Sequence, residues 1–268
     1  MFTDVILAID VGNSRIKFGL LRPAARGEPQ TLPVPVATVA VPINETFDWS
    51  SVFELCTVNQ AQIERVAVAG ANPVAVERIR ASWPVPGQCE PRVVNRHTDL
   101  GLKISVEFPE QVGIDRLLMA VAADVLRPPD HPAIIVGAGT ATTINLVTHT
   151  GTFAGGAILP GLELGARSLH QFTALLPLVD IPSLLDAPQI PALGRNTHAA
   201  ISSGLWYGHL GAIRELISQL SGGSPCQPAL YVTGGNGRRL ASGLGGDYQF
   251  IPDLTLRGLA CVAMRSES

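Results

Sequence analysis

The chain has 268 residues, enough for one large domain or two of ordinary size. Hydrophobic residues make up 46% and charged residues 15%, which permits a sizeable core and excludes a disordered chain, since disorder requires low hydrophobicity and high net charge. A net charge of −3 without any basic run argues against a nucleic-acid partner.

The sequence carries no signal for export or for a membrane. The N-terminus lacks the basic start and small-residue cleavage site of a signal peptide. No apolar stretch approaches the roughly 20 residues that cross a bilayer. The four cysteines are too widely spaced for a zinc or redox motif. We therefore expect a cytoplasmic protein with reduced thiols and no membrane partner.

The first half of the chain predicts an α/β arrangement. Two apolar runs, residues 5–9 and 16–21, flank a short turn and so predict a strand, a tight turn and a second strand. The elements expected after them are a strand, a helix, a strand and a mostly apolar helix, at residues 36–41, 48–64, 66–69 and 117–123.

The second half opens with the same strand, loop, strand design. Residues 133–136 and 144–147 predict two strands joined by a turn of small residues. We interpret this as an internal duplication, with an N-terminal domain over residues 1–128 and a C-terminal domain over residues 129–268. The remaining expected elements are a strand, a helix, a loop, a long helix, a strand and two helices, at residues 153–159, 160–176, 177–193, 197–220, 230–233, 238–244 and 254–264.

Three glycine-containing loops, at residues 10–14, 137–140 and 233–237, follow apolar strands and suit phosphate. Glycine lets the backbone approach an anion closely, so that successive amides can donate to it. Asp10 could hold Mg²⁺ through water, and Lys17 could place its ammonium on a phosphate. One such loop is usually only a turn, so the indication rests on finding three together. The P-loop and Rossmann glycine patterns are both absent from the sequence.

Asp115 precedes the apolar helix and admits two interpretations. It could cap the helix by accepting hydrogen bonds from backbone amides. It could instead be the general base that a kinase uses to orient or deprotonate the attacking hydroxyl. The adjacent Arg116 has the forked guanidinium that suits a substrate carboxylate. Together they would give a hydroxy acid both a base and an anchor.

Short motifs in a fixed order make the chain resemble the type III pantothenate kinases from about residue 5 to residue 260. Residues 10–17, DVGNSRIK, resemble the D-x-G-N-[TS]-x-x-K phosphate loop of that family. Residues 112–116, VGIDR, resemble its G-x-D-R segment, and residues 139–143 its second phosphate loop. Further matching stretches lie at residues 155–161, 175–177, 194–197, 203–204, 233–235 and 252–259.

The resemblance implies an α/β fold of duplicated actin-like (ribonuclease H-like) domains with an ATP cleft between them. It implies ATP-dependent phosphorylation of pantothenate to 4'-phosphopantothenate, the first step of coenzyme A synthesis, with Asp115 as catalytic base. It also implies Mg²⁺ held by Asp10 through water, a monovalent cation such as K⁺ or NH₄⁺, and a homodimer with the substrate site near its interface. The ATP-binding residues implied are Asp10, Val11, Gly12, Asn13, Ser14, Arg15, Ile16, Lys17 and Thr140. The pantothenate-binding residues implied are Gly113, Ile114, Asp115, Arg116 and Thr197.

Three positions depart from the family pattern. Gly137 stands where the family has the aspartate that binds the monovalent cation, which predicts a lost or altered cation site. Asn145 stands where a second aspartate is frequent, and Val106 where a tyrosine usually contacts pantothenate. Two alternatives to an active pantothenate kinase therefore stay open. One is a catalytically weak regulatory or binding member of the family, and the other is an enzyme that acts on another small hydroxy acid.

Overall fold

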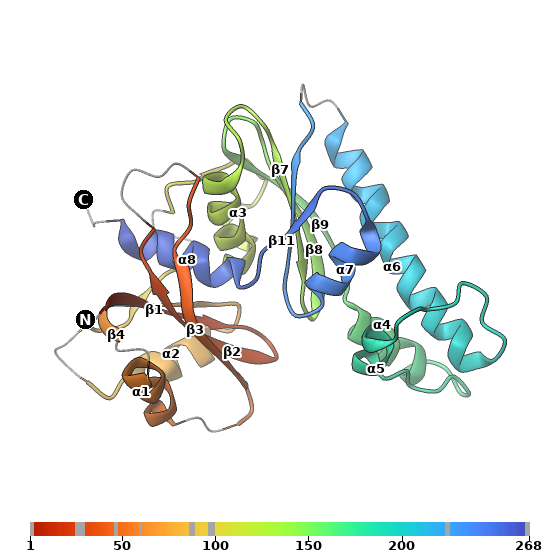
Figure 1. The fold of residues 1–268 in the computed structure, drawn as a ribbon, viewed down its shortest axis with the longest axis horizontal. Coiled ribbons are helices and arrows are strands. Elements are labelled where there is room, and N and C mark those ends of the chain that lie inside the picture. Colours follow the sequence, from red (N-terminus) through yellow and green to blue (C-terminus); the bar gives the residue numbers. More distant parts are fainter. Residues whose placement is uncertain are drawn as a thin grey trace. The chain divides into compact units, whose positions relative to one another are not determined.

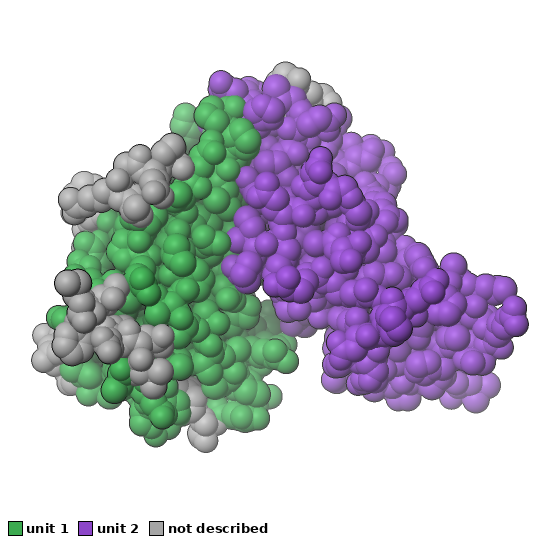
Figure 2. All heavy atoms as spheres, in the orientation of Figure 1, with its two compact units in different colours: residues 1–129, 151–153, 253–268 green, residues 130–150, 154–252 purple. Residues whose placement is uncertain are grey.

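The computed structural model describes residues 3–24, 30–45, 48–58, 61–85, 89–95, 100–222 and 226–265. The chain divides into two compact units (Figure 2). The first comprises residues 1–129, 151–153 and 253–268, and the second residues 130–150 and 154–252. No helix among the described residues is long and apolar enough to span a bilayer.

The first unit is built on a five-stranded sheet in the order β3-β2-β1-β4-β5. Figure 1 labels β1, β2, β3 and β4 of this sheet. β1 pairs antiparallel with β2, and β2 with β3, whereas β4 is parallel to both β1 and β5. The strands are β1 (Thr3–Val11), β2 (Arg15–Arg22), β3 (Val34–Pro42), β4 (Ala61–Gly70) and β5 (Arg92–Val93).

Helices cover both faces of this sheet. The side chains of a strand alternate between the two faces. Val5, Leu7 and Ile9 join the buried cluster under two helices, whereas Ile6 and Ala8 are buried outside that cluster. The helices of the cluster are α1 (Trp49–Val58) and α2 (Pro73–Ala81), and the helices on the opposite face are α3 (Ile114–Leu126) and α8 (Leu254–Met264). Asp10 follows the alternation of Ile6 and Ala8 and therefore points toward the side of α3 and α8.

The second sheet repeats the topology of the first. Its order is β11-β10-β7-β8-β9-β6. If the short edge strand β6 is left aside, the first strand in chain order, β7, lies between the second, β8, and the fourth, β10, just as β1 lies between β2 and β4. In both sheets the third strand lies beyond the second and the fifth beyond the fourth. The duplicated α/β fold expected from the sequence is therefore confirmed. The strands are β6 (Lys103–Ile104), β7 (Ala133–Ala138), β8 (Ala141–Val147), β9 (Thr152–Pro160), β10 (Ala229–Thr233) and β11 (Tyr248–Phe250).

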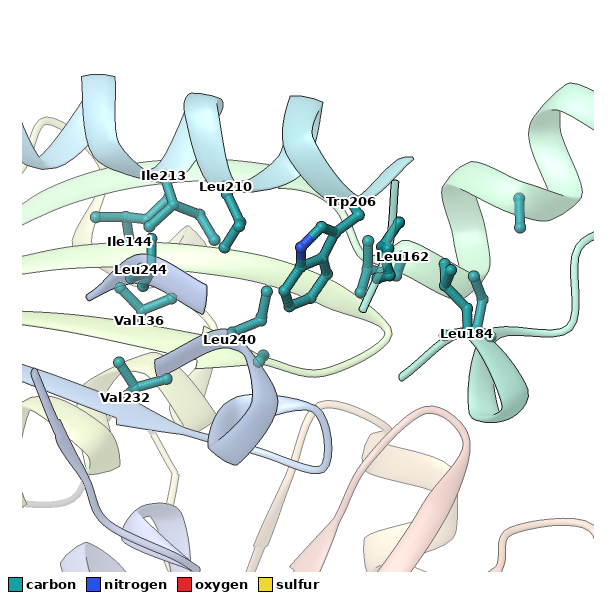
Figure 3. Close-up of a cluster of buried hydrophobic side chains, with 14 of the residues drawn as sticks. Val136, Ile144, Leu162, Leu184, Trp206, Leu210, Ile213, Val232, Leu240 and Leu244 are labelled. Carbon is teal, nitrogen blue, oxygen red and sulfur yellow. The ribbon is translucent and has the colours of Figure 1, made fainter. Parts of the chain in front are cut away.

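The core of the second unit gathers around Trp206, which projects from its longest helix toward the strands (Figure 3). Leu210 and Ile213 of the same helix, with Leu162 and Leu240 of other helices, belong to the cluster. The helices of this unit are α4 (Leu162–Gln171), α5 (Ile181–Asp186), α6 (Thr197–Ser221) and α7 (Gly237–Leu244). A 3₁₀ turn, η1 (Pro109–Gln111), precedes α3 in the first unit.

The structure corrects three of the predicted elements. The helix expected over residues 48–64 ends at Val58, and β4 begins at Ala61, because residues 61–63 pair with β1. Residues 59 and 60 lie outside the described residues. The loop expected over residues 177–193 contains α5, whose N-cap Asp180 accepts a hydrogen bond from the amide of Ser183. The helix expected over residues 160–176 is also shorter, as α4.

The C-terminal helix α8 belongs to the first unit by its contacts, although it lies in the second of the two domains expected from the sequence. It packs closely on α3, because a side-chain carbon at Gly258 would lie 2.0 Å from the carbonyl oxygen of Leu118. Glycine at residue 258 thus permits the contact that fixes α8, and with it the residue that precedes α8, against the first sheet.

Candidate active site

Three carboxylates and one ammonium share an electrostatic neighbourhood in the first unit. Asp10 is the last residue but one of β1 and lies directly opposite Lys17 of β2. The pKa of Asp10 is raised to about 7, chiefly by burial; the charge of Lys17 lowers it, and the charges of Asp115 and Asp253 raise it. These two acids belong to the first turn of α3 and to the N-cap of α8. Strand alternation and helix packing therefore bring the cluster together.

Asp253 is a member of this cluster that sequence reasoning did not single out. Its Oδ1 lies 3.6 Å from the Nζ of Lys17, and both side chains are partly exposed. An acid directly before a predicted helix is a weak signal, because such residues are usually helix caps. Only the packing of α8 on the first sheet places this one beside Lys17.

The turn between β1 and β2 has an open tip. The amide of Gly12 donates to the carbonyl of Arg15 over 2.9 Å, which closes the turn, and the side chains of residues 13–15 are exposed. Val11 and Ile16, by contrast, are buried in the core of the unit. A ligand at this turn could therefore meet the side chains of residues 13–15, but only the backbone of Val11 and Ile16.

An open polar cavity of about 260 Å³ adjoins this turn at Asn13. Asn72, which caps α2, and Arg78 also line it. Neither Asp10 nor Lys17 lines the cavity. The carboxylates and the cavity therefore mark different places, and we locate the candidate chemistry at the carboxylates, because a carboxylate can accept a proton whereas the amides and the guanidinium that line the cavity cannot.

The start of α3 carries the half-buried carboxylate of Asp115. The N-cap of α3 is Gly113, and Asp115 lies inside the first turn of the helix, so the interpretation of Asp115 as the helix cap is wrong. A side-chain carbon at residue 113 would lie 2.5 Å from Oδ1 of Asp115. Glycine at this position therefore leaves room for the carboxylate to fold back over the beginning of the helix.

The two residues that flank Asp115 have different surroundings. Ile114 is buried, so its side chain belongs to the core. Arg116 is half-buried, and its guanidinium carbon lies 5.7 Å from the ring centroid of Phe153. Burial lowers the pKa of Arg116, and the neighbouring charge of Asp115 opposes that shift. The ring contact fixes the position of this guanidinium beside the carboxylate, and a guanidinium in a fixed position can bind an anionic group of a ligand.

In the second unit, three backbone segments meet at the loop after β7. Gly139 and Thr140 are exposed at its tip, and the amide of Gly161 donates to the carbonyl of Thr140 over 3.0 Å. A side-chain carbon at Gly161 would lie 2.4 Å from that carbonyl oxygen. At Gly234, where φ is +97°, it would lie 2.3 Å from the carbonyl oxygen of Ala138. Two of the expected phosphate loops, 137–140 and 233–237, are thus in contact.

The other residues of the second unit that the sequence analysis named carry no charge. Gly137 pairs with Thr143 and Thr233 across the sheet, and the buried Asn145 donates to the hydroxyl of Thr143 over 3.2 Å. Thr197 is the exposed first residue of α6. Hydroxyls and an amide, without a carboxylate, therefore surround Gly137 among these neighbours.

The two sheets and the acidic cluster define a duplicated α/β protein of the kind in which a loop after the first strand of each half can bind phosphate. Comparison with known proteins gives the family: the sequence matches the type III pantothenate kinase family over residues 6–219. A type III pantothenate kinase from Gluconobacter oxydans is 33% identical over 264 residues, which cover 98% of this chain and 94% of that protein. One from Rhodospirillum rubrum is 33% identical over 271 residues, with 98% and 99% covered. This chain belongs to the type III pantothenate kinase family.

A solved structure supports the fold. The crystal structure of a conserved protein assigned to the Baf family of transcriptional activators, from Campylobacter jejuni, aligns with a TM-score of 0.58 and covers 96% of each chain. The sequence identity of 19% makes this a similarity of fold alone.

Proposed function

We propose that this chain transfers a phosphoryl group from ATP to the hydroxyl of pantothenate, giving 4'-phosphopantothenate at the first step of coenzyme A synthesis in the cytoplasm. Membership of the family supports the reaction. The structural observation that carries it to particular residues is the uncapped start of α3, where Asp115 stands beside Arg116 and interacts electrostatically with Asp10.

The proposed substrate site uses the first turn of α3. Asp115 accepts the proton of the attacking hydroxyl or orients that hydroxyl toward the phosphorus. Arg116 holds the carboxylate of pantothenate through its forked guanidinium. The backbone of residues 113–114 and the hydroxyl of Thr197 supply further contacts. Roles of this kind need groups held in place, and burial with a ring contact holds Arg116.

The proposed ATP site uses residues 10–17 and Thr140. The exposed turn after Asp10 offers amides and side chains to the phosphates, and Lys17 offers an ammonium. The chemistry of Asp10 fits Mg²⁺, because a cation near it would offset the burial and the two carboxylates that raise its pKa. Among the described residues no three acidic, histidine or cysteine side chains form a metal-binding group. Mg²⁺ bound through water and substrate phosphates is compatible with that arrangement.

We propose that the monovalent-cation site of the family is lost or altered in this chain. The neighbours of Gly137 that bear on the position, Thr143, Asn145 and Thr233, carry no charge. A neutral site of hydroxyls and an amide offers less to K⁺ than a carboxylate does. Comparing initial rates in K⁺ and in a large organic cation tests this, and strong activation by K⁺ would refute it.

We propose that the protein is a homodimer through an apolar surface of the second unit. Phe172 is 78% exposed and Leu175 90% exposed, both directly after α4. A contiguous patch of exposed apolar side chains marks an association surface. We assign to the proposed surface the exposed large apolar residues of this unit, which are Ile158, Leu164, Leu169, Phe172, Leu175, Leu178, Leu193 and Tyr207.

The test of the proposed function is a coupled ADP-release assay with Mg·ATP and a panel of small hydroxy acids. We expect kcat/KM for pantothenate to exceed that for pantoate, glycerate and mevalonate. Preference for another acid of the panel would move the assignment to that substrate. Absence of turnover with the whole panel, while ATP still binds, would favour the binding-protein alternative.

A further inference from the structure

Asp253 is held in a backbone conformation that a helix cap does not require. It is the N-cap of α8, but its φ of 53° and ψ of 34° lie in the left-handed region, which residues with a side chain rarely adopt. An ordinary capping aspartate has extended backbone and accepts a bond from the helix, and Asp253 makes no such bond. Its carboxylate is instead 3.6 Å from Lys17.

The helix that carries Asp253 is firmly anchored in the first unit. Leu254 and Leu256 are fully buried, and the guanidinium of Arg257 donates to the carbonyl of Pro33 over 3.0 Å. The amide of Arg257 also donates to the backbone carbonyl of Asp253 over 3.0 Å. Since α8 cannot shift without disturbing the core, it presents the Asp253 carboxylate from a fixed position.

Lys17 has a choice of acidic partners. Asp10 lies opposite it in the β1–β2 register and feels its charge, and Asp253 forms the ion pair. An ammonium has three donors and a flexible stem, so its position depends on which carboxylate holds it. Of these two acids, only Asp10 would be left to pair with Lys17 if Asp253 were removed. Asp10 is the residue proposed to face the Mg²⁺ side of the nucleotide.

We propose that Asp253 is a positioning residue of the nucleotide site, which holds the Lys17 ammonium away from Asp10 and leaves a donor free for a phosphate oxygen. The inference rests on the proposed function, in which Lys17 contacts ATP. The proposal adds the N-cap residue of α8 to the site. The other residues of the first unit proposed for this site lie in the β1–β2 hairpin and in α3.

The test is a double-mutant cycle on nucleotide affinity, measured by calorimetric titration of Mg·ATP without pantothenate. Asp253→Asn keeps the shape and the tolerance for left-handed backbone and removes the charge. We expect it to weaken Mg·ATP binding about tenfold, the effect of one partly exposed charge-assisted contact. KM for pantothenate should not change. In a Lys17→Met background, Asp253→Asn should have no further effect, because both changes remove the same contact.

Two controls separate this role from a structural one. Asp180→Asn alters a conventional N-cap acid in the second unit and should leave Mg·ATP affinity unchanged. Asp253→Gly relieves the left-handed conformation, so it should weaken ATP binding as Asp253→Asn does without loss of thermal stability.

Three results would overturn the inference. They are wild-type affinity in Asp253→Asn, an equal loss of affinity in the Lys17→Met background, and a wild-type protein that binds no Mg·ATP. Failure of the proposed function is distinguishable, because a protein that bound Mg·ATP without phosphorylating pantothenate would still give the cycle a result.

Discussion

Asp10 and Lys17 face each other across the first two strands of the chain. The register of the hairpin alone sets this pair, and the folded protein then adds two acids beside it. Burial, Asp115 and Asp253 outweigh Lys17, so the pKa of Asp10 rises from 3.8 to about 7. The site therefore has an unfavourable excess of negative charge, which a cation accompanying ATP would offset.

The raised pKa of Asp10 predicts that its replacement stabilises the protein at high pH. The folded state binds this proton more tightly than the unfolded state, so the stability contributed by the protonated group is lost as pH rises from 3.8 through about 7. We expect Asp10→Asn to exceed the wild type in free energy of unfolding by more at pH 8 than at pH 5, in denaturant titrations without divalent cations.

A matched control for this prediction is Asp48→Asn. Asp48 is exposed, and hydrogen bonds from Ser50 lower its pKa, so its replacement should give no gain at pH 8. If Asp10→Asn raised the free energy of unfolding equally at pH 5 and at pH 8, the ionised form of Asp10 would not be what destabilises the wild type at high pH. Loss of stability at pH 8 would lead to the same conclusion.

Replacing the proposed base should remove turnover and leave the fold intact. Asp115→Asn is expected to lower kcat by roughly 10²–10⁴, the usual contribution of a positioned general base. Asp124→Asn, on the same helix, removes an ion pair with Arg127 and should leave kcat unchanged. Steady-state assays of both variants give the comparison, and a near-normal rate in Asp115→Asn would mean that another group takes the proton.

Replacement of the glycine that precedes α3 should lower the catalytic rate. In Gly113→Ala the new carbon would lie 2.5 Å from Oδ1 of Asp115, so the carboxylate must move. We expect kcat to fall at least severalfold, because small displacements of a catalytic group are costly.

The control for that variant is Gly211→Ala in α6, where a side-chain carbon would meet nothing within 4 Å. It should raise the free energy of unfolding by about 1 kcal/mol through helix propensity, with kcat unchanged. Equal kcat values in the two variants would show that Asp115 does not depend on the space at residue 113.

The apolar surface on the second unit predicts an oligomer that a single charge can dissociate. Phe172→Asp or Leu175→Asp should turn a dimer into a monomer in light scattering, since a buried unpaired carboxylate is strongly unfavourable. Val74→Asp, at a residue 81% exposed in the first unit, should leave the dimer intact. A wild-type monomer, or a dimer insensitive to both changes, would refute the proposed interface.

The local parts of the site could be predicted from the sequence, and the long-range parts could not. The hairpin that pairs Asp10 with Lys17 follows from two apolar runs and one turn. The contact of Lys17 with Asp253 depends on α8 returning from the end of the chain to pack on the first sheet. No periodicity in the sequence specifies which sheet a helix covers.

The mispredicted elements have the same origin. The pattern of residues 48–64 is compatible with a helix, but parallel pairing with β1 forms β4 from residue 61 onward. Tertiary pairing overrides local propensity there. The short α5 escapes a pattern search because it has only six residues and a proline in its first turn, which also suits a loop. Its signal was the cap acid Asp180.

The most direct test of the central claim is to identify the product formed from pantothenate and Mg·ATP by the purified protein. We predict one ADP for each pantothenate consumed, and a product that carries the phosphoryl group on the hydroxyl of pantothenate, as seen by mass spectrometry and phosphorus NMR. Asp115→Asn should form that product only at a trace rate. ADP released at the same rate without pantothenate, or pantothenate recovered unchanged beside the wild-type protein, would contradict the account.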